Sequence, residues 1–451
     1  MNHDSKDRYK KIFLFIYAIF ELIPETLLFY FVWIRYYAPG FGYFIYPWLQ
    51  NTLLAFYFAE VGVITLFYGG YRLGHYRSEE LLLSKMLSLF SADVIIYGVI
   101  CMITREFRNP LALIVLFIAE SVFSYGYSMF LHMIECKLFP PRKLLLIFGD
   151  KGSGEMLDIF RTRPDKFIIE DTVSATEPQE KILEMAKNYD GIIIHRVDYY
   201  LRTELIHLCY ENGIRAYVVP TISDIVIWSS GNNHLFDTPL FITKDYTMTA
   251  FESLVKRISD IVIAGLMLIV FSPIMLIIAL LIKCYDKGPV FYTQERVTRG
   301  GKHFRIIKFR SMKVDSEADS GIILARKYDD RVTPVGKVIR NIHFDELPQL
   351  FNVIKGEMSM VGPRPERPEI IEKYRKEIPE FDYRLAVKAG LTGYAQVYGR
   401  YKTTSYNKLK MDILYIENYS LILDLKLLLL TFKILFQKEN SEGLEDNDRT
   451  I

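Results

Sequence analysis

Two adjacent carboxylates in the C-terminal third of the chain have the residue types and the setting for phosphoryl-transfer chemistry. Asp345 and Glu346 come just before Pro348, a residue that suits the first turn of a helix. The helix dipole stabilises negative charge at such a start. Neighbouring helical residues point about 100° apart, so the two carboxylates are not expected to share one role. We predict that Asp345 attacks phosphorus and that Glu346 binds a metal ion beside it.

Cations in nearby segments suit the charge of a transferred phosphoryl group. The sequence from Gly288 to Phe309 predicts a β-hairpin that turns at Gly300-Gly301. Lys308 and Arg310 alternate at its end, so we expect both on one face. Arg340 precedes Asp345 by five residues. We predict that Lys308 and Arg340 stabilise charge on the phosphoryl group.

The segment Gly362-Pro363-Arg364-Pro365 predicts a stiff turn that presents a guanidinium. Arginine suits bidentate contacts with phosphate, and prolines remove flexibility that lowers affinity. A plain surface loop is the alternative interpretation. The residues that we expect to contact a substrate from these segments are Arg296, Arg310, Pro363, Arg364 and Pro365.

Taken together, these motifs resemble the bacterial sugar transferase family, the polyprenyl-phosphate glycosyl-1-phosphate transferases, from about Lys256 to Phe436. The resemblance implies the same roles for the two carboxylates and the two cations, and it places the Arg364 turn near the nucleotide end of the substrate. It extends over the segment 388–400 and implies that Gln396 and Arg400 contact the substrate. The chain departs from the family pattern at Thr298, at His343-Phe344 and at Ala389, where proline is usual. None of these departures removes a charged group with an assigned role.

The resemblance also implies an activity. A sugar-1-phosphate, with glucose or galactose expected, passes from a UDP-sugar to undecaprenyl phosphate through a covalent aspartyl intermediate, and UMP is released. This is the first membrane step of exopolysaccharide, capsule or O-antigen synthesis. Mg²⁺ is the expected cofactor, because it prefers hard oxygen ligands such as Glu346 and substrate phosphates.

The composition fits a multi-domain membrane protein. The chain has 451 residues, of which 51% are hydrophobic and 24% charged. Its net charge of +2 gives no reason to expect nucleic acid as a partner. The four cysteines lie far apart without a Cys-x-x-Cys pair, so their spacing predicts neither a zinc site nor a disulfide framework.

Residues 1–140 predict a bundle of four transmembrane helices. Each apolar stretch is near the roughly 20 residues that a helix needs to cross a bilayer. The stretches are Ile12–Ile34, Trp48–Tyr68, Leu81–Ile103 and Leu111–Ile134. Lysine and arginine are more frequent in the segments that lie inside if the N-terminus is cytoplasmic, which places both ends of the bundle inside. Carboxylates within the spans are interpreted as hydrogen-bonded between helices, with a transport role as the alternative.

Residues 141–245 predict a Rossmann-like, doubly wound α/β domain, because strands at 143–150, 191–195 and 214–220 alternate with helices. The spacing Gly149-x-x-Gly152-x-Gly154 differs from the dinucleotide fingerprint, so nucleotide binding is the less favoured interpretation. The domain resembles the degenerate nucleotide-fold domain of larger family members.

Residues 246–438 predict a small α+β catalytic domain with a re-entrant membrane helix at 258–283. Lysine or arginine flanks both ends of this helix, and Ser272-Pro273 interrupts it, with the serine able to satisfy a freed backbone group. A kinked fifth crossing is the alternative. Leu421–Phe436 predicts an interfacial amphipathic helix, and residues 439–451 predict a disordered tail.

The sequence therefore predicts a multi-pass enzyme of the bacterial inner membrane with a cytoplasmic catalytic domain in contact with membrane lipid. Homo-oligomers are possible partners. The alternatives are a membrane glycosyltransferase that releases UDP, a non-catalytic membrane regulator that senses a nucleotide, and a scaffold for polysaccharide export.

Overall fold

A computed structural model describes residues 3–41, 47–74, 78–149, 154–235, 238–243, 248–313, 331–399 and 403–435. The chain forms two compact units, Met1–Pro220 and Thr221–Ile451. The predicted boundary between the α/β and catalytic domains, at residue 245, stays a prediction. Helix α8 (Ile222–Trp228) packs its buried Ile222 and Ile225 with Ile413 of the second unit, which explains why the division of contacts comes earlier.

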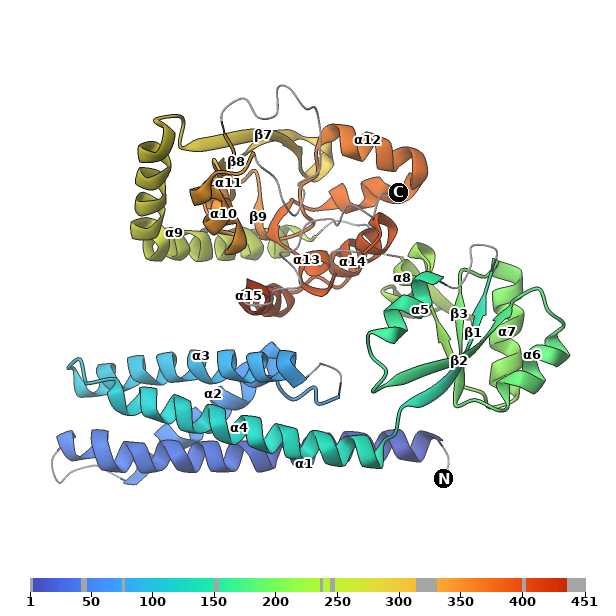
Figure 1. Ribbon diagram of the computed structural model, residues 1–451, viewed down its shortest axis with the longest axis horizontal. Coiled ribbons are helices and arrows are strands. Elements are labelled where there is room, and N and C mark those ends of the chain that lie inside the picture. The colour runs from blue at the N-terminus through green and yellow to red at the C-terminus, as the bar shows by residue number, and fades with distance from the viewer. Residues whose placement is uncertain are drawn as a thin grey trace. The chain divides into compact units, whose positions relative to one another are not determined.

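The first unit begins with long apolar helices. These are α1 (His3–Val32), continued by the short turns η1 (Trp33–Tyr37) and η2 (Ala38–Phe41), and then α2 (Pro47–Tyr68), α3 (Ser78–Thr104) and α4 (Leu111–Leu138). Figure 1 shows α1 to α4 running alongside one another in shades of blue and cyan. Within the described ranges, these helices and α9 of the second unit are long and apolar enough to cross a membrane. The expectation of several apolar helices near the N-terminus is confirmed.

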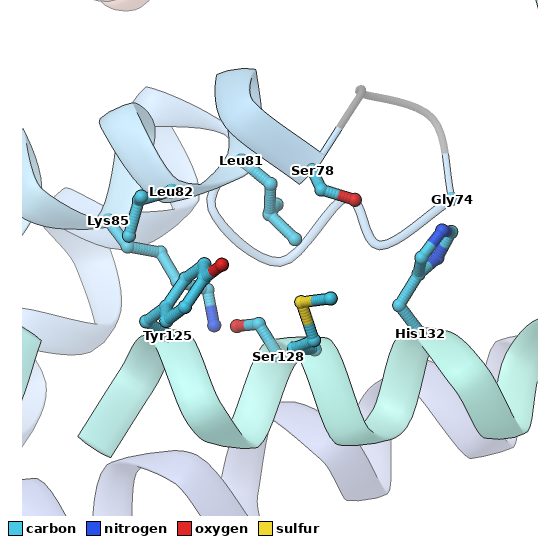
Figure 2. A pocket seen from close by; sticks show the side chains of 9 residues that line it. Gly74, Ser78, Leu81, Leu82, Lys85, Tyr125, Ser128 and His132 are labelled. Carbon is cyan, nitrogen blue, oxygen red and sulfur yellow. The ribbon is translucent and has the colours of Figure 1, made fainter. Parts of the chain in front are cut away.

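Several polar side chains within this bundle are paired between helices, whereas both buried carboxylate oxygens of Glu60 have no hydrogen-bond partner among the described residues. Lys85 of α3 forms an ion pair with Glu21 of α1 and also contacts Tyr17. Tyr57 of α2 donates a hydrogen bond of 2.8 Å to Glu120 of α4. Figure 2 shows Lys85 pointing from α3 toward α4, beside a pocket of about 20 Å³. These contacts support the interpretation that intramembrane charges hold the helices together.

The α/β region that follows has a parallel sheet, as expected. Its elements are β1 (Arg142–Phe148), α5 (Gly154–Arg161), β2 (Phe167–Ser174), α6 (Gln179–Ala186), β3 (Gly191–His195), α7 (Tyr199–Glu211) and β4 (Ala216–Val218). The sheet order is β2-β1-β3-β4, and every pair is parallel. Alternate residues of β1 enter different cores: Leu144 packs with Met156 of α5, and Leu145 packs with Ile182 of α6. Helices therefore cover both faces of the sheet, as Figure 1 shows.

The second unit is an α+β assembly, and its described residues form three small two-stranded sheets. After α8 come β5 (Gly231–Leu235), β6 (Thr238–Ile242), α9 (Ala250–Asp286), β7 (Phe291–Val297), η3 (Arg299–Gly301) and β8 (His303–Phe309). Then follow α10 (Pro334–Asn341), η4 (Phe344–Glu346), α11 (Gln349–Lys355), β9 (Ser359–Val361), α12 (Pro368–Glu377), η5 (Pro379–Ala386), β10 (Gly390–Thr392), α13 (Tyr394–Tyr398), α14 (Ser405–Glu417) and α15 (Leu421–Leu435).

The hairpin expected before the carboxylates is present. Strands β7 and β8 pair antiparallel with Phe291 opposite Phe309. The turn between them uses Gly300 at φ 67° and Gly301 at φ 76°, a region that glycine adopts without strain. The buried face of β8 joins α9, α11 and β9 in one hydrophobic core that contains Phe309, Leu350 and Met360.

Helix α9 is one continuous helix with Pro273 inside it, and Figure 1 shows it turning sharply. Ser272 Oγ donates a hydrogen bond of 2.9 Å to the carbonyl of Ile269, next to the proline. The first turns of the helix are attached to the catalytic unit through polar groups. Lys256 forms a buried ion pair of 2.6 Å with Asp424 of α15, and Arg257 Nη1 donates to the carbonyl of Val353 at 2.7 Å. The middle of the helix exposes apolar side chains. Re-entry at Ser272-Pro273 stays a prediction.

Candidate functional site

The two carboxylates lie in the short 3₁₀ turn η4, between α10 and α11. His343 enters this turn with φ 56°, the left-handed conformation. Pro348 is the N-cap residue of α11, so the carboxylates precede this helix by one turn and do not lie in its first turn. They still approach its positive end. The change of direction at His343 sets the orientation of Asp345 and Glu346.

Glu346 accepts contacts from two cations that come from distant segments. Lys308 Nζ of β8 lies 2.6 Å from Glu346 Oε1, and Arg364 Nη2 lies 3.0 Å from the same oxygen. Burial opposes the charge on Glu346, but Arg364 and Lys308 more than compensate and hold the pKa of Glu346 well below its usual range. Glu346 is therefore an ionised carboxylate at neutral pH.

Asp345 has the opposite environment. Its side chain is buried, and burial together with the charge of Glu346 raises the pKa of Asp345 above its ordinary value. Lys308, Arg340 and His343 act in the other direction and favour the ionised form. The structure thus brings Asp345, Glu346, Lys308 and Arg340 together. It also shifts the pKa values of the two carboxylates in opposite directions.

Arg310 does not share the partner of Lys308. Arg310 Nη2 forms an ion pair with Asp286 at the end of α9, and its guanidinium packs over Gly288. It therefore joins α9 to the hairpin, a role that the alternation of Lys308 and Arg310 does not reveal. Its predicted contact with substrate stays a prediction.

The segment 362–365 is held tightly against the strand pair β9-β10. The carbonyl of Pro363 accepts a hydrogen bond of 2.9 Å from the Gly390 amide. An added Cβ on Gly390 meets the backbone nitrogen of Gly362 at 2.1 Å, so only glycine permits this approach. The backbone around Arg364 is fixed, while its guanidinium reaches Glu346.

Arg296 and Arg384 also hold this segment in place, through hydrogen bonds to its backbone carbonyls. Arg296 Nη1 donates to the carbonyl of Pro365 at 3.2 Å, and Arg384 Nη2 donates to the carbonyl of Arg364 at 2.9 Å. Arg384 also pairs with the buried Asp412 at 2.9 Å. Sequence reasoning missed Arg384 and Asp412, because nothing in their spacing indicates that they meet.

Two of the departures from the family pattern contact each other. The Ala389 amide donates a hydrogen bond of 3.1 Å to Thr298 Oγ1. Proline, which is usual at the position of Ala389, has no such donor. The threonine hydroxyl in turn donates to the carbonyl of Glu357 at 3.0 Å. At position 389, beside the 362–365 segment, this chain therefore has an alanine that hydrogen-bonds to Thr298 in place of the stiffer proline.

A pocket of about 470 Å³ opens at this cluster. Its lining includes the charged residues Glu346, Arg364, Arg384 and Asp412. It also includes apolar residues of α9 and α15, namely Met267, Phe271, Leu428 and Phe432. The residues that flank Asp345 in the sequence, Phe344 and Glu346, also line the pocket. The pocket is therefore lined by both charged and apolar side chains.

Of the remaining predicted residues, Gln396 lies at the pocket and Arg400 is not among the described residues. Gln396 lines the pocket, donates to the carbonyl of Leu391 at 3.1 Å, and has a buried Oε1 without a hydrogen-bond partner among the described residues. Arg400 and the predicted tail 439–451 lie outside the described residues.

Comparisons with known proteins identify relatives of the C-terminal part of the chain. The family model "Bacterial sugar transferase" matches residues 251–438. The chain is 39% identical over 254 residues to a UDP-N-acetylgalactosamine-undecaprenyl-phosphate N-acetylgalactosaminephosphotransferase of Aeromonas hydrophila, which covers 55% of this chain and 59% of that protein. It is 36% identical over 297 residues to a UDP-glucose:undecaprenyl-phosphate glucose-1-phosphate transferase of Klebsiella pneumoniae, which covers 61% of this chain and 64% of that protein. The matched part is thus less than two thirds of these two relatives' length.

A shorter relative is covered more fully. The chain is 51% identical over 137 residues to a putative undecaprenyl-phosphate N-acetylgalactosaminyl 1-phosphate transferase of Bacillus subtilis, which covers 30% of this chain and 76% of that protein.

Proposed function

Because this chain belongs to the bacterial sugar transferase family, we propose that it transfers a sugar-1-phosphate from a UDP-sugar to undecaprenyl phosphate and releases UMP. The relatives that it matches are named for transfers of this kind. The observation that carries the proposal is the convergence of Lys308 and Arg364 on Glu346, directly beside the buried Asp345. Two cations beside two carboxylates suit the binding of a diphosphate.

Asp345 is the proposed nucleophile. A carboxylate oxygen of Asp345 forms a bond to the β-phosphorus of the donor, and the bond from that phosphorus to the bridging oxygen breaks, so UMP leaves with the bonding electron pair. A phosphate oxygen of the acceptor lipid then attacks the same phosphorus and releases Asp345. The two half-reactions replace one difficult displacement by two easier ones.

In this proposal, binding of the donor moves two cations and brings the donor's phosphorus to the nucleophile. Lys308 and Arg364 both contact Oε1 of Glu346. A diphosphate carries more negative charge than one carboxylate and competes for the same two cations. We infer that the donor draws Lys308 and Arg364 away from Glu346, which brings phosphorus next to Asp345.

Glu346 is the proposed Mg²⁺ ligand, and its chemistry fits that ion. It is ionised, and both of its cation contacts use Oε1, so within the described residues Oε2 has no ion pair or hydrogen bond. A bound Mg²⁺ supplies charge neutralisation for the diphosphate and the departing UMP. Glu346→Gln keeps the shape and weakens the Mg²⁺ dependence of the rate. An unchanged Mg²⁺ titration in Glu346→Gln contradicts this role.

The apolar residues of the pocket suit the acceptor lipid. They include residues of α9 and α15, the most apolar helices of the second unit. We propose that the lipid phosphate approaches the charged residues while its chain lies along these helices. This requires α9 to enter the membrane from the cytoplasmic side and return at Ser272-Pro273, with α15 at the membrane surface.

The proposed membrane arrangement is consistent with the entry of α9 into the membrane from the cytoplasmic side. Helices α1 to α4 cross the inner membrane four times, the region 141–245 is a Rossmann-like domain, and the catalytic unit lies in the cytoplasm, where UDP-sugars are made. The long apolar helices and the bias of lysine and arginine support this arrangement. Association of copies stays a prediction.

The identity of the released nucleotide tests the activity. Membranes that contain the full chain are incubated with undecaprenyl phosphate, Mg²⁺ and, separately, UDP-glucose, UDP-galactose or UDP-N-acetylgalactosamine. We expect UMP with at least one of these donors, with glucose or galactose preferred. Release of UDP instead indicates a glycosyltransferase that breaks the sugar–oxygen bond, and it rules the proposal out.

A further inference from the structure

Three side chains with the chemistry of zinc ligands lie on one face of α4 in the first unit. His132, Glu135 and Cys136 are spaced i, i+3 and i+4, so they project from the same side of the helix. Each offers one ligand atom, and these atoms all lie within 4.8 Å of one another. We propose that these residues bind a zinc ion at the C-terminal end of α4.

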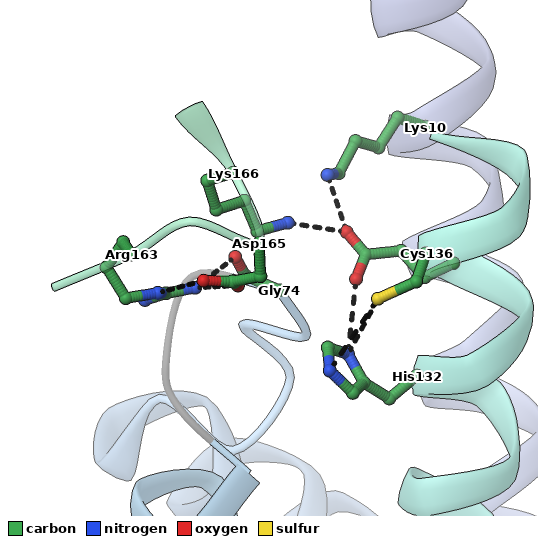
Figure 3. Close-up of polar contacts among 8 residues, drawn as sticks. Lys10, Gly74, His132, Cys136, Arg163, Asp165 and Lys166 are labelled. Carbon is green, nitrogen blue, oxygen red and sulfur yellow. Dashed lines mark hydrogen bonds and ion pairs between the residues drawn. The ribbon is translucent and has the colours of Figure 1, made fainter. Parts of the chain in front are cut away.

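Two of the three distances between the donor atoms are near those of a tetrahedral site, and the third is at most 4.8 Å. His132 Nδ1 lies 3.4 Å from Glu135 Oε2 and 3.9 Å from Cys136 Sγ. Zinc bonds of about 2.0–2.3 Å at tetrahedral angles separate ligand atoms by about 3.3–3.5 Å. Figure 3 shows the imidazole of His132 and the sulfur of Cys136 facing each other. Small side-chain rotations therefore suffice to close the site.

Glu135 has one buried oxygen that makes no hydrogen bond among the described residues, although it lies 3.4 Å from His132 Nδ1. The residue is 1% exposed, and its Oε1 accepts contacts of 2.7 Å from both Lys10 and Lys166. Its Oε2 has no hydrogen-bond partner among the described residues and faces His132. A buried acceptor without a partner is costly, and a metal ion provides one. Hydrogen bonds to the other oxygen are the usual support of a ligating carboxylate.

The loop after α2 fixes this carboxylate in place. An added Cβ on Gly74 lies 2.2 Å from Glu135 Oε1 and 2.6 Å from Oε2, so the glycine backbone covers the carboxylate. Arg163 Nη2 donates to the Gly74 carbonyl at 2.9 Å and also pairs with Asp165 (Figure 3). A ligand held from several sides loses little entropy when it binds.

The site differs from the expectation of the sequence. Cysteine spacing alone predicts no zinc site, because only Cys136 of the four cysteines takes part; the other ligands are Glu135, which directly precedes it, and His132, one helical turn before it. Cys136 is exposed, which leaves room for a water as fourth ligand. Binding displaces the thiol proton to solvent. The ammonium groups of Lys10 and Lys166, which pair with the other oxygen of Glu135, lower the affinity of the site for a cation.

Cobalt reports on such a site independently of sugar transfer. The purified full chain in detergent, with a non-chelating reductant, is titrated with Co²⁺. We expect a near-ultraviolet absorption band from sulfur-to-cobalt charge transfer that saturates at one ion per chain and disappears on addition of Zn²⁺. His132→Ala and Cys136→Ser weaken Co²⁺ binding at least about tenfold, as the loss of a ligand or its support does.

Cys284→Ser is the matched control, because it also removes one exposed cysteine. The band persists in this variant if the proposal is right. The proposal is overturned if the wild-type chain gives no such band, if the band survives Cys136→Ser, or if Cys284→Ser abolishes it; the cluster is then an ion-pair contact only. A Mg²⁺ site at Glu346 has no sulfur ligand and gives no such band, so the two sites are distinguished.

Discussion

At the scale of single residues, two neighbouring carboxylates are separated by their surroundings. Glu346 has two cations against one oxygen and a pKa well below its usual range, whereas burial and Glu346 itself raise the pKa of Asp345. Opposed shifts of this kind assign different roles to paired acids. Glu346 is therefore suited to remain ionised and to position cations, and Asp345 is suited to act as a desolvated nucleophile.

The pH dependence of the rate tests this assignment. A nucleophilic Asp345 must be ionised, so activity is lost as the pH falls through its pKa, which lies above the ordinary aspartate value. Arg340 favours the ionised form. In Arg340→Gln we therefore expect the acid limb of the kcat/KM profile to move to higher pH, with a loss on the order of tenfold or more.

Lys337→Gln is the control for Arg340→Gln, because it removes one positive charge from the exposed side of the same helix. Its acid limb should coincide with that of the wild-type enzyme. If Arg340→Gln leaves the limb in place, or if Lys337→Gln moves it equally, Asp345 is not the group that titrates.

The sequence predicts the residues of this site better than their pairings. Lys308, Glu346 and Arg364 are recognisable from charge and spacing, and the structure brings them together. Arg310 with Asp286, and Arg384 with Asp412, are pairs between distant segments, and a single sequence carries no signal for such contacts. The bond between Ala389 and Thr298 likewise joins residues that the sequence shows only as separate departures.

At the scale of elements, the Arg364 segment depends on close packing of backbones. Gly390 and Gly362 approach too closely for any side chain. In Gly390→Ala the added methyl pushes the 362–365 segment away, so Arg364 no longer reaches Glu346. We expect transfer activity to fall at least tenfold, with a loss of stability of about 1–3 kcal/mol.

Gly265→Ala in α9 is the matched change for Gly390→Ala, since an added Cβ there has no neighbour within 4 Å. Rates and unfolding midpoints of both variants are measured on the purified full chain. Near-normal activity of Gly390→Ala excludes a role for the tight packing in placing Arg364.

The attachment of α9 to the catalytic unit gives a second prediction at this scale. The ion pair between Lys256 and Asp424 is buried, and Tyr415 donates a hydrogen bond of 2.8 Å to Asp424. Lys256→Met leaves the carboxylate of Asp424 buried and unpaired, which destabilises the chain by about 3–5 kcal/mol.

The double variant with Asp424→Leu should recover most of the stability that Lys256→Met loses, because no unpaired charge is then left. Thermal unfolding of the full chain in detergent measures both changes. Equal midpoints for Lys256→Met and the wild-type protein contradict an attachment that depends on this ion pair.

Elements with a strong hydrophobic pattern are predictable from the sequence, and others are not. The apolar helices, the buried strands β1 and β3 and the hairpin follow from length, periodicity and glycine. Strand β2 was missed, because it is at the edge of the sheet and mostly exposed, so its residues lack a continuous apolar run. The 3₁₀ turn at Asp345 was predicted as the start of a helix, because Pro348 suits both.

At the scale of the whole molecule, the catalytic residues belong to one compact unit. All of the described candidate residues lie within Thr221–Ile451. The Bacillus subtilis relative matches only 30% of this chain, yet the match covers 76% of its own length, so a protein much shorter than this chain carries the same region. We predict that a protein that begins at Thr221 retains transfer activity within about tenfold of the full chain.

Activity of the shortened protein is measured in detergent with the donor that the full chain prefers. A protein that is folded by circular dichroism but inactive shows that the first unit contributes to catalysis. The same result favours the alternative in which the α/β region regulates or completes the enzyme.

Release of UMP in the absence of the acceptor lipid tests the central claim most directly. The full chain, stripped of lipid phosphate, is mixed with its preferred UDP-sugar and Mg²⁺, and UMP is counted per protein. A covalent intermediate on Asp345 predicts a rapid burst that approaches one UMP per chain and is absent from Asp345→Asn. No burst in the wild-type protein, or an equal burst in Asp345→Asn, contradicts the account.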